Sequence, residues 1–538
     1  METMLILGAG LMQRSAIEAA KEEGYFTLVV DANPNAVCVP YADRFEKIDL
    51  KNKDEILKLA QTLGSDLKGV FTCSTDFSES VSYVAQNLGL VSHTLEAARN
   101  ASNKLRMRKC FEQNSLSSPS FSEVTRQTLS GYLEGGILNS TVFPKVIKPQ
   151  DNMGARGCRI IRRKEEFLSA CEDAIISSRT GRAILEDYME GPEFSIDALV
   201  HKGTLTITGF ADRHIFYQPY FIEMGHTMSS NFPKAEINRV IECFAKGVKA
   251  LGLSEGAAKG DIKLARLKSG EYVPMIGEIA GRLSGGYMSG WTFPYASGLN
   301  LTKEALLIAA GKEPQTLEKL RKPLDIKGTG FDLYEVECGA VSAERAFISI
   351  PGIVKEIYGR ENAEACPYVK NLYFRVKAGD RVDFPRNNVE KCGNVITLSN
   401  DYNLAVESAA SAVSKIVLRL EPSVAETEKF LLGKVPAHEK GFPPDAFQLT
   451  EQEQKRFMEF LDSAREIPEN KSITMFIPKV LEEIKDTRKD WNNRTIAETV
   501  KLFDDIRMIH PKLDCKTFWK CFVRGGIQGA LYMCDSKW

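Results

Sequence analysis

Short apolar runs alternate with segments of helical spacing over the first hundred residues of this chain. Three apolar runs predict strands, and they lie at Met4–Leu7, Thr27–Val30 and Val70–Cys73. Three segments carry apolar side chains three and four positions apart, which predicts helices over 12–23, 53–62 and 79–88. Strands that alternate with helices are typical of a parallel sheet with helices on its faces. We therefore expect an α/β domain over residues 1–100.

The rest of the chain predicts three further parts. A helical segment runs from Ser92 to Asn114, and residues 101–330 then mix strands with helices. Residues 331–420 are another mixed segment that ends in an amphipathic helix over 405–418. A linker is marked by Pro436, Pro443 and Pro444. Beyond it, helical spacing occurs over 452–464, 477–486 and 495–508. Residues 421–538 therefore form a helical extension in which we find no catalytic chemistry.

One predicted hairpin carries the main candidate chemistry. A turn at Ser269 and Gly270 joins two strands, and pairing counted from that turn places Asp261 opposite Glu278. Facing Cβ atoms lie about 5 Å apart, so two like charges there destabilise a sheet unless a cation lies between them. Alternation along the strand adds Arg282 to the same face. Two carboxylates and an arginine suit Mg²⁺ and a phosphoryl group. The alternative is a solvated hairpin edge with scattered charges.

A glycine-rich segment lies between two further predicted strands. Residues 150–157 follow the strand that ends at Lys148 and Pro149, and they suit a flap over phosphates. Glycine lets backbone N–H groups approach oxyanions closely, and Lys148 reaches the same phosphates as a point charge. The alternative is an ordinary hairpin with an exposed lysine. The chain contains no Walker motif.

A second glycine motif follows the first strand. Gly8 and Gly10, with Asp31 ending the second strand, are similar to a dinucleotide fingerprint. The third glycine of that fingerprint is replaced by Gln13. The motif therefore leaves open two interpretations, a bound NAD or a tight strand-to-helix turn.

Residues 182–196 begin as a strand, break at Gly191 and Pro192, and resume as a strand. Such a break frees backbone groups that need other partners, and an adenine edge would supply them. Glu193, just past the break, would accept hydrogen bonds from ribose hydroxyls. The alternative is an exposed turn rich in acidic residues.

Composition is ordinary for a globular protein, with 43% hydrophobic and 26% charged residues. The net charge of −1 gives no electrostatic argument for nucleic acid or membrane as a partner. We find no run of 18 apolar residues and no signal-peptide layout. The 12 cysteines include no Cys-x-x-Cys pair, which predicts reduced thiols and a cytoplasmic location. A metal at Cys515, Cys521, Cys534 and His510 is the weaker alternative.

An ordered set of residues resembles the ATP-grasp superfamily, and the similarity covers about residues 4–420. The set consists of Lys104, Lys148, the glycine-rich loop, Glu186, Glu193, Asp261, Glu278 and Arg282. The resemblance implies an N-terminal preATP-grasp domain (Rossmann-like) over 1–100 and an ATP-grasp domain of two α+β subdomains over 101–330. It also implies a lid subdomain over 331–420 that is similar to that of biotin carboxylase. The helical extension over 421–538 follows the lid. It implies phosphate contacts from Lys104, Lys148 and a mobile loop with Gly154, Ala155 and Gly157. It implies adenine contacts from Glu186, Asp187 and Tyr188, a ribose contact from Glu193, and Mg²⁺ on Asp261 and Glu278.

The segment Glu278–Gly286 is similar to the variant found in carboxylate–amine ligases that handle amino acids, although Ala280 stands where asparagine is usual. That departure leaves the number of metal ions open. The segment Tyr220–His226 resembles a strand that faces the acceptor substrate in those ligases. The resemblance implies that Arg282 binds the transferring phosphoryl group, while Glu223 or His226 orients the amine or accepts its proton.

The implied reaction is ATP-dependent joining of a small carboxylate to an amine, with Mg²⁺ or Mn²⁺, through an acyl phosphate that releases ADP and then phosphate. Two other classes remain open. One is carboxyphosphate chemistry of the biotin carboxylase or carbamoyl-phosphate type, and the other is a non-catalytic ATP-binding regulator. We also expect residues 421–538 to provide an interface, either with a second copy of the chain or with another protein.

Overall fold

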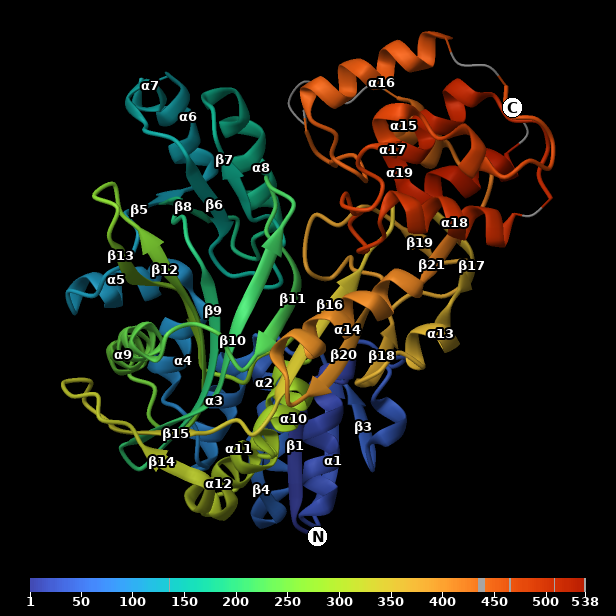
Figure 1. The fold of residues 1–538 in the computed structure, drawn as a ribbon. Helices are drawn as coiled ribbons and strands as arrows, with labels where there is room; N and C mark the ends of the chain where they lie inside the picture. Colours follow the sequence, from blue (N-terminus) through green and yellow to red (C-terminus); the bar gives the residue numbers. More distant parts are fainter. Residues whose placement is uncertain (135, 434–440, 464–465, 508, 537–538) are drawn as a thin grey trace. The chain divides into compact units, whose positions relative to one another are not determined.

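The structure is a computed structural model of the 538-residue chain, and it describes residues 1–134, 136–433, 441–463, 466–507 and 509–536 (Figure 1). The chain forms two compact units. Unit 1 comprises Met1–His214, His226–Ala343 and Leu398–Tyr402. Unit 2 comprises Ile215–Gly225, Glu344–Thr397 and Asn403–Trp538. Each unit is described by itself.

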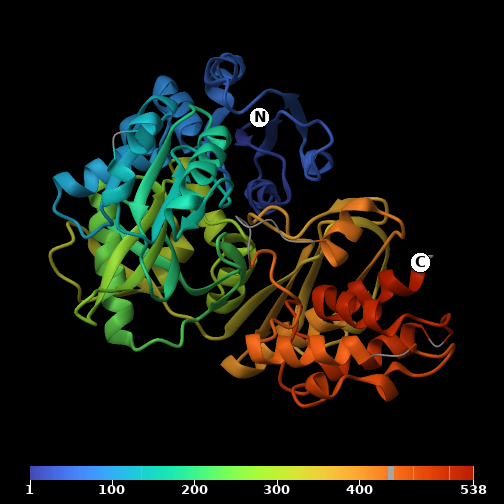
Figure 2. The same cartoon turned by 90° about the horizontal axis from the view of Figure 1, so that it is seen from above.

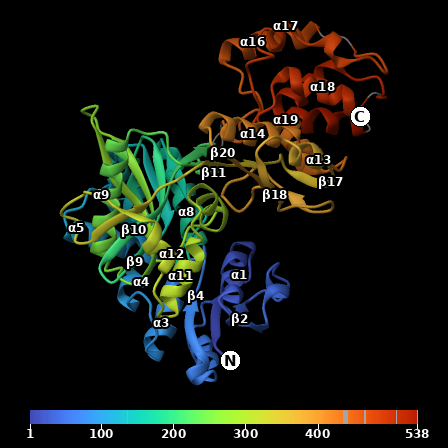
Figure 3. The same ribbon diagram turned by 60° about the horizontal axis from the view of Figure 1, so that its bottom comes forward.

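The N-terminal part of unit 1 confirms the expected parallel sheet. Its strands are β1 (Thr3–Leu7), β2 (Phe26–Asp31), β3 (Arg44–Lys47) and β4 (Leu67–Phe71). They pair in parallel in the order β3-β2-β1-β4. Figure 3 labels β2 and β4 of this sheet. Its helices are α1 (Arg14–Glu22), α2 (Lys53–Gln61) and α3 (Ser78–Leu88). Every residue of β1 is buried, as expected for a strand covered on both faces.

Gln13 occupies the turn in which a dinucleotide fingerprint would have its third glycine. A Cβ atom at Gly8 would lie 3.2 Å from the Gln13 side chain. Gln13 Nε2 donates to Thr75 Oγ1 at 2.8 Å, and Gln13 Oε1 accepts from the Cys73 amide at 2.9 Å. Asp31 accepts a hydrogen bond from the Ala9 amide at 2.8 Å. These contacts favour a turn role for the two glycines over a dinucleotide site.

The helical segment expected from Ser92 to Asn114 is two helices, α4 (Leu95–Ser102) and α5 (Lys104–Gln113). Asn103 separates them because its backbone is extended, with φ −123° and ψ 112°. Its side-chain oxygen accepts from the Arg106 amide at 3.0 Å and caps α5. Lys104 therefore lies in the first turn of a new helix.

A four-stranded antiparallel sheet forms a small subdomain of unit 1. Its strands are β5 (Phe121–Val124), β6 (Lys145–Pro149), β7 (Arg159–Ile161) and β8 (Ala183–Asp187), in the order β5-β8-β6-β7. Its helices are α6 (Arg126–Glu134), α7 (Ile137–Ser140) and α8 (Phe167–Ser177). The glycine-rich segment joins β6 to β7, so the expected order of strand, loop and strand is confirmed.

The central sheet of unit 1 contains β9 (Glu193–His201), β10 (Thr204–Phe216), β12 (Gly256–Arg266) and β13 (Tyr272–Ala280). These strands are antiparallel neighbours in the order β13-β12-β9-β10. Helix α9 (Lys234–Leu251) lies against one face (Figure 1). A Cβ atom at Gly260 would meet the Phe244 ring of α9 at 2.4 Å, which shows how closely the helix approaches. The other face is free to carry polar side chains.

The remaining elements of unit 1 follow the central sheet. Helices α10 (Phe293–Ser297), α11 (Leu301–Ala309) and α12 (Gln315–Leu320) lead to β14 (Arg321–Pro323) and β15 (Asp332–Val336). Strand β15 pairs in parallel with β10. Strand β11 (Ile222–Met228) contributes its last residues to this unit, beginning at His226.

Unit 2 combines two groups of strands with helices. Its strands are β16 (Val341–Phe347, from Glu344 on), β17 (Gly352–Tyr358), β18 (Val369–Phe374), β19 (Arg381–Val382), β20 (Gly393–Ser399, up to Thr397) and β21 (Val417–Leu420). Strands β19-β17-β21 form one sheet, and β18 pairs with β20. The first helices of the unit are α13 (Arg360–Glu364) and α14 (Tyr402–Lys415). The prediction of a mixed segment ending in a helix is confirmed, although β21 follows that helix.

The helical extension is confirmed, but its helices differ from the expected ones. They are α15 (Ala425–Leu432), α16 (Glu451–Ser463), α17 (Lys479–Glu482), α18 (Ile496–Ile506) and α19 (Cys515–Asp535). Helix α17 is shorter than the predicted 477–486, and α15 and α19 were not predicted. Pro436, Ala464 and Met508 lie outside the described residues.

The extension and the lid share one hydrophobic core within unit 2. Helices α15–α19 form a single cluster, drawn orange to red (Figures 1 and 2). Asn492 accepts from the Ile348 amide at 3.0 Å and donates to the Ile348 carbonyl at 2.9 Å. Gln528 donates to the Leu418 carbonyl at 2.8 Å. The described part of residues 421–538 therefore shares a core with residues 346–420, and its predicted role as an interface stays a prediction.

Candidate active site

Charged and polar side chains occupy alternate positions on the face of the central sheet that α9 does not cover. The residues between them, such as Ile196 and Ile262, are buried in the core that includes α9. Because side chains alternate along a strand, the polar set shares the opposite face. It comprises Glu193, Ser195 and Asp197 on β9, Arg213 on β10, Lys259, Asp261 and Lys263 on β12, and Glu278 on β13. This face is the candidate site.

A β-bulge brings Asp261 and Glu278 opposite each other. The predicted pairing of these two residues is confirmed. Nearer the turn, each residue of β12 pairs with a β13 residue one position earlier than the count from the turn predicted, as Ala265 with Val273 shows. The register shifts between Asp261 and Ile262, which leaves Gly277 as the extra residue. A Cβ atom at Gly277 would lie 2.9 Å from the Asp261 carbonyl oxygen, so the bulge favours glycine.

Asp261 presents one unpartnered oxygen. Its Oδ2 contacts Lys259 and lies 3.0 Å from Arg213 Nη1. Its Oδ1 is buried and has no hydrogen-bond partner. A buried carboxylate oxygen without a partner is costly, and a divalent cation would satisfy it. The pair Asp261 and Glu278 therefore fits Mg²⁺, although the described residues contain no group of three or more His, Cys, Asp or Glu side chains arranged around a metal.

Lys104 links α5 to Glu278. Lys104 Nζ lies 3.2 Å from Glu278 Oε1 and donates to the Asn152 carbonyl at 3.0 Å. Burial favours the neutral form of Glu278, but the charges of Lys104, Lys259 and Arg282 outweigh it and lower its pKa to about 2. Glu278 is therefore a carboxylate at neutral pH, as a metal ligand must be.

Lys148 pairs with Glu186 instead of facing open space. Lys148 Nζ lies 2.8 Å from Glu186 Oε2, and Arg108 Nε lies 2.6 Å from Glu186 Oε1. The Glu186 side chain is 2% exposed. Burial favours its neutral form, but the two cations lower its pKa to about 2. The structure places the Glu186 carboxylate in a buried ion-pair network, and the adenine contact that the family resemblance implies for this residue stays a prediction.

The other predicted nucleotide residues line the adjoining segments. Asp187 contacts Lys145 and Ser120. The Tyr188 ring lies under Lys263 Nζ, 5.4 Å from its centroid, and Glu193 lies 3.4 Å from the same lysine. The loop residues with positive φ are Gly154 (+68°), Ala155 (+60°) and Gly157 (+69°). A Cβ atom at Gly157 would lie 2.6 Å from Ser177 Cβ, so this glycine also serves the packing of the loop against α8.

Arg282 lies in a loop that is held from two sides. Arg282 Nε lies 3.3 Å from Asp76 Oδ1, and Arg282 Nη1 donates to the Leu283 carbonyl at 3.1 Å. The next loop residue, Ser284, donates from its amide at 3.0 Å and from its hydroxyl at 2.5 Å to Asp197. Asp197 is fully buried, and this burial raises its pKa to about 7. The loop therefore has fixed contacts with β9 and with the segment after β4.

Glu223 and His226 belong to different compact units. His226 is fully buried in unit 1, where its Nε2 lies 2.9 Å from Thr292 Oγ1. Glu223 lies in unit 2, where its amide donates to Asn388 at 2.8 Å and its carbonyl accepts from Lys391 at 2.7 Å. The structure describes each in its own unit, and the role of either residue at the amine stays a prediction.

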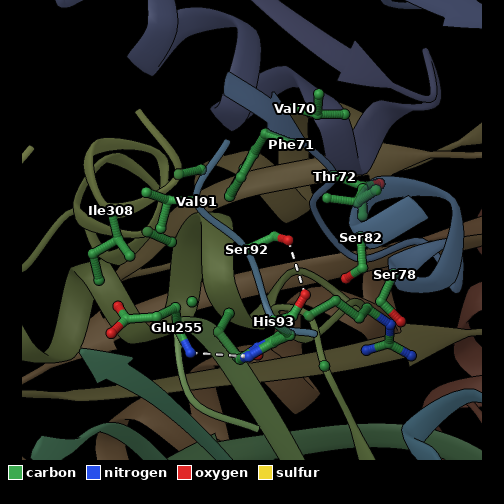
Figure 4. A pocket seen from close by; sticks show the side chains of 17 residues that line it. Val70, Phe71, Thr72, Ser78, Ser82, Val91, Ser92, His93, Glu255 and Ile308 are labelled. Atoms are coloured by element: carbon green, nitrogen blue, oxygen red, sulfur yellow. Dashed lines mark hydrogen bonds between the residues drawn. The ribbon is translucent and has the colours of Figure 1, made fainter. Parts of the chain in front are cut away.

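A cavity of about 50 Å³ lies in unit 1 among β4, α3, α11 and the start of β12 (Figure 4), and Arg282 is one of its lining residues. His93 lines it with both ring nitrogens engaged. Its Nε2 lies 2.8 Å from the Ala257 carbonyl, and its Nδ1 accepts from the Ser254 and Glu255 amides at 3.2 Å. Burial lowers the pKa of His93, so this ring is a neutral structural contact.

Sequence reasoning missed five residues of this region. Lys259 and Asp197 follow the alternation along β12 and β9, and Arg213 follows it along β10, so a two-residue period in the sequence would have found them. Arg108 is four residues after Lys104, which places both on one face of α5. Asp76 has no local signal, because only the fold brings it to Arg282.

Family models match two parts of the chain. An ATP-grasp domain matches residues 141–289, and the L-amino acid ligase C-terminal domain 2 matches residues 346–421. Together with the solved structures below, these matches confirm the predicted ATP-grasp fold.

Several solved structures share the fold. The L-amino acid ligase from Bacillus licheniformis is 17% identical with a TM-score of 0.64, and the alignment covers 78% of this chain and 99% of that one. The phosphoribosylglycinamide synthetase from Anaerococcus prevotii is 22% identical with a TM-score of 0.58, covering 78% and 100%. At these identities the likeness shows the fold alone.

Among curated proteins, carnosine synthase 1 from Gallus gallus is 24% identical over 334 residues, which is 58% of this chain and 35% of that protein. The carbamoyl phosphate synthase large chain from Neisseria meningitidis is 26% identical over 228 residues, which is 38% of this chain and 20% of that protein. The chain thus spans 35% or less of the length of these relatives. No helix among the described residues has the length and apolar character needed to cross a membrane.

Proposed function

We propose that this protein is an ATP- and Mg²⁺-dependent ligase that joins the carboxylate of one small molecule to the amine of another, releasing ADP and phosphate. The observation that supports this most directly is the cross-strand pair Asp261 and Glu278, with one unpartnered carboxylate oxygen, on the same face as two lysines and an arginine. The matches to an L-amino acid ligase domain and to carnosine synthase 1 support amino acids as the substrate class.

Positioning and charge neutralisation are the main tasks of a protein in phosphoryl transfer. Lys104 and Lys148 bind the phosphates of ATP, and loop residues 151–157 cover them. Arg282 binds the carboxylate that accepts the phosphoryl group and then the acyl phosphate, for which its planar fork suits it. Asp76 and Asp197 hold the Arg282 loop in place.

Asp261 and Glu278 would hold Mg²⁺, and Mn²⁺ has similar preferences for oxygen ligands. The metal, when bound, neutralises phosphate charge. Asp187, Tyr188 and Glu193 line the nucleoside end of the site. Either His226 or Glu223 orients the attacking amine or accepts its proton, and this proton is lost as the C–N bond forms and phosphate departs.

The test is release of ADP and phosphate from ATP with pairs of amino acids, together with mass spectrometry of the product. The Glu278→Gln variant should lose turnover by at least a hundredfold while it remains folded at the assay temperature, as circular dichroism checks. Glu165→Gln, an exposed acid of the small subdomain, is the matched control and should keep full activity. Wild-type-like turnover in Glu278→Gln would refute the metal pair. Turnover that depends on bicarbonate and needs no amine would instead support carboxyphosphate chemistry.

A further inference from the structure

Arg108 is a buried arginine whose guanidinium contacts two separate segments of unit 1. Its side chain lies within α5, one helical turn after Lys104, and the residue is 1% exposed. Nε donates to Glu186 Oε1 at 2.6 Å, Nη1 donates to the Ile276 carbonyl at 2.9 Å, and Nη2 donates to the Gly277 carbonyl at 2.8 Å. One planar group therefore joins β8 to the hairpin of β12 and β13.

The two carbonyls belong to the β-bulge that sets the direction of Glu278. A bulge interrupts the ladder, so its backbone groups need donors from elsewhere, and buried carbonyls without donors are costly. Arg108 supplies both donors. A strand without the extra residue would place Glu278 on the face covered by α9, because a shift of one residue moves every side chain to the other face. The guanidinium thus stabilises the geometry that pairs Glu278 with Asp261.

The remaining donor, Nε, influences Lys148 through Glu186, and Lys148 is a predicted ligand of the ATP phosphates. Glu186 divides its two carboxylate oxygens between Arg108 and Lys148. Without Arg108, Lys148 would be the remaining ion-pair partner of Glu186 shown by the structure. A lysine held more tightly by a buried carboxylate is less available to a phosphate.

We propose that Arg108 is a positioning residue that sets both the metal pair and the phosphate-binding Lys148, without touching ATP or metal itself. The inference rests on the proposed nucleotide and metal site. Lysine cannot replace it, because a single ammonium lacks the fixed fork that spans a carboxylate and two adjacent carbonyls.

The first measurement is the calorimetric affinity for a non-hydrolysable ATP analogue with and without Mg²⁺. The result is expressed as the dissociation constant without Mg²⁺ divided by the dissociation constant with Mg²⁺. Arg108→Lys should reduce this ratio at least tenfold. A second variant, Arg108→Met with Glu186→Gln, removes the stranded buried charge and should show the same reduction. Val248→Ala, which opens a cavity in the same core on α9, is the matched control and should keep the wild-type ratio within twofold.

The second measurement is hydrogen exchange in the ligand-free protein. In both Arg108 variants the amides of residues 276–280 should exchange at least tenfold faster than in Val248→Ala. If ratio and exchange match those of the control, the inference is wrong. If the wild type itself shows no effect of Mg²⁺ on nucleotide affinity, the proposed function fails, and exchange alone then decides whether Arg108 holds the bulge.

Discussion

Replacing Glu186 by glutamine tests the electrostatics of the buried network in unit 1. The structure gives this carboxyl a pKa of about 2 against an ordinary value of 4.5, because Arg108 and Lys148 together outweigh the cost of burial. At about 1.4 kcal/mol per pKa unit, the difference corresponds to about 3 kcal/mol of stability at neutral pH. Glu186→Gln should therefore lower the free energy of unfolding of unit 1 by about that amount at pH 7.

The pH dependence has a definite sign. Since the pKa of Glu186 is lower in the folded state than in the unfolded state, its contribution is complete above about pH 5 and is lost as the pH falls from 4.5 toward 2. The wild type should thus lose more stability than Glu186→Gln over this range, and the two should converge in acid.

The assay is unfolding in urea at pH 7, 5 and 3, monitored by the hydrogen exchange of peptides that cover β8. Glu165→Gln in the same subdomain is the control, because this exposed side chain lies outside the network. Equal stability of wild type and Glu186→Gln at pH 7, or parallel pH profiles, would refute the reasoning.

Two further predictions concern the nucleotide site and unit 2. Lys148→Ala should weaken ATP binding about tenfold by calorimetry, as expected for one lost charge on a phosphate, while the exposed Lys164→Ala should not. An unchanged affinity would count against the phosphate role of Lys148. Asn492→Ala should destabilise unit 2 by about 2–4 kcal/mol, because it leaves the buried amide and carbonyl of Ile348 unpaired. Thermal unfolding followed by the fluorescence of buried Trp519 measures this, and an unchanged midpoint would contradict it.

Local patterns in the sequence predicted the elements whose signals are local. The parallel sheet followed from short apolar runs, and the Asp261–Glu278 pairing followed from a turn. Helix α19 was missed because 16 of its 21 residues are buried, so its apolar positions are not confined to one stripe. Gly525 and Gly526 also look like a loop, and Gly526 does have a non-helical backbone, with φ 57°.

The candidate site was predicted only as far as single strands allow. The bulge at Gly277 depends on the partner strand, so the sequence of β13 alone does not reveal it. The contact between Asp76 and Arg282 joins residues about two hundred positions apart, and no periodicity encodes such a distance. Glu186 was recognised as important, but its partner Arg108 was not, because only packing brings α5 to β8.

The shared core of unit 2 limits where this chain can be shortened. A protein that stopped at Leu420 would uncover Ile350 and Leu418, and it would leave the Leu418 carbonyl without Gln528. Newly uncovered apolar surface beside strands with unpaired backbone groups promotes self-association. Expression of the first 420 residues should therefore yield aggregates, and work on catalysis should retain the helices that follow.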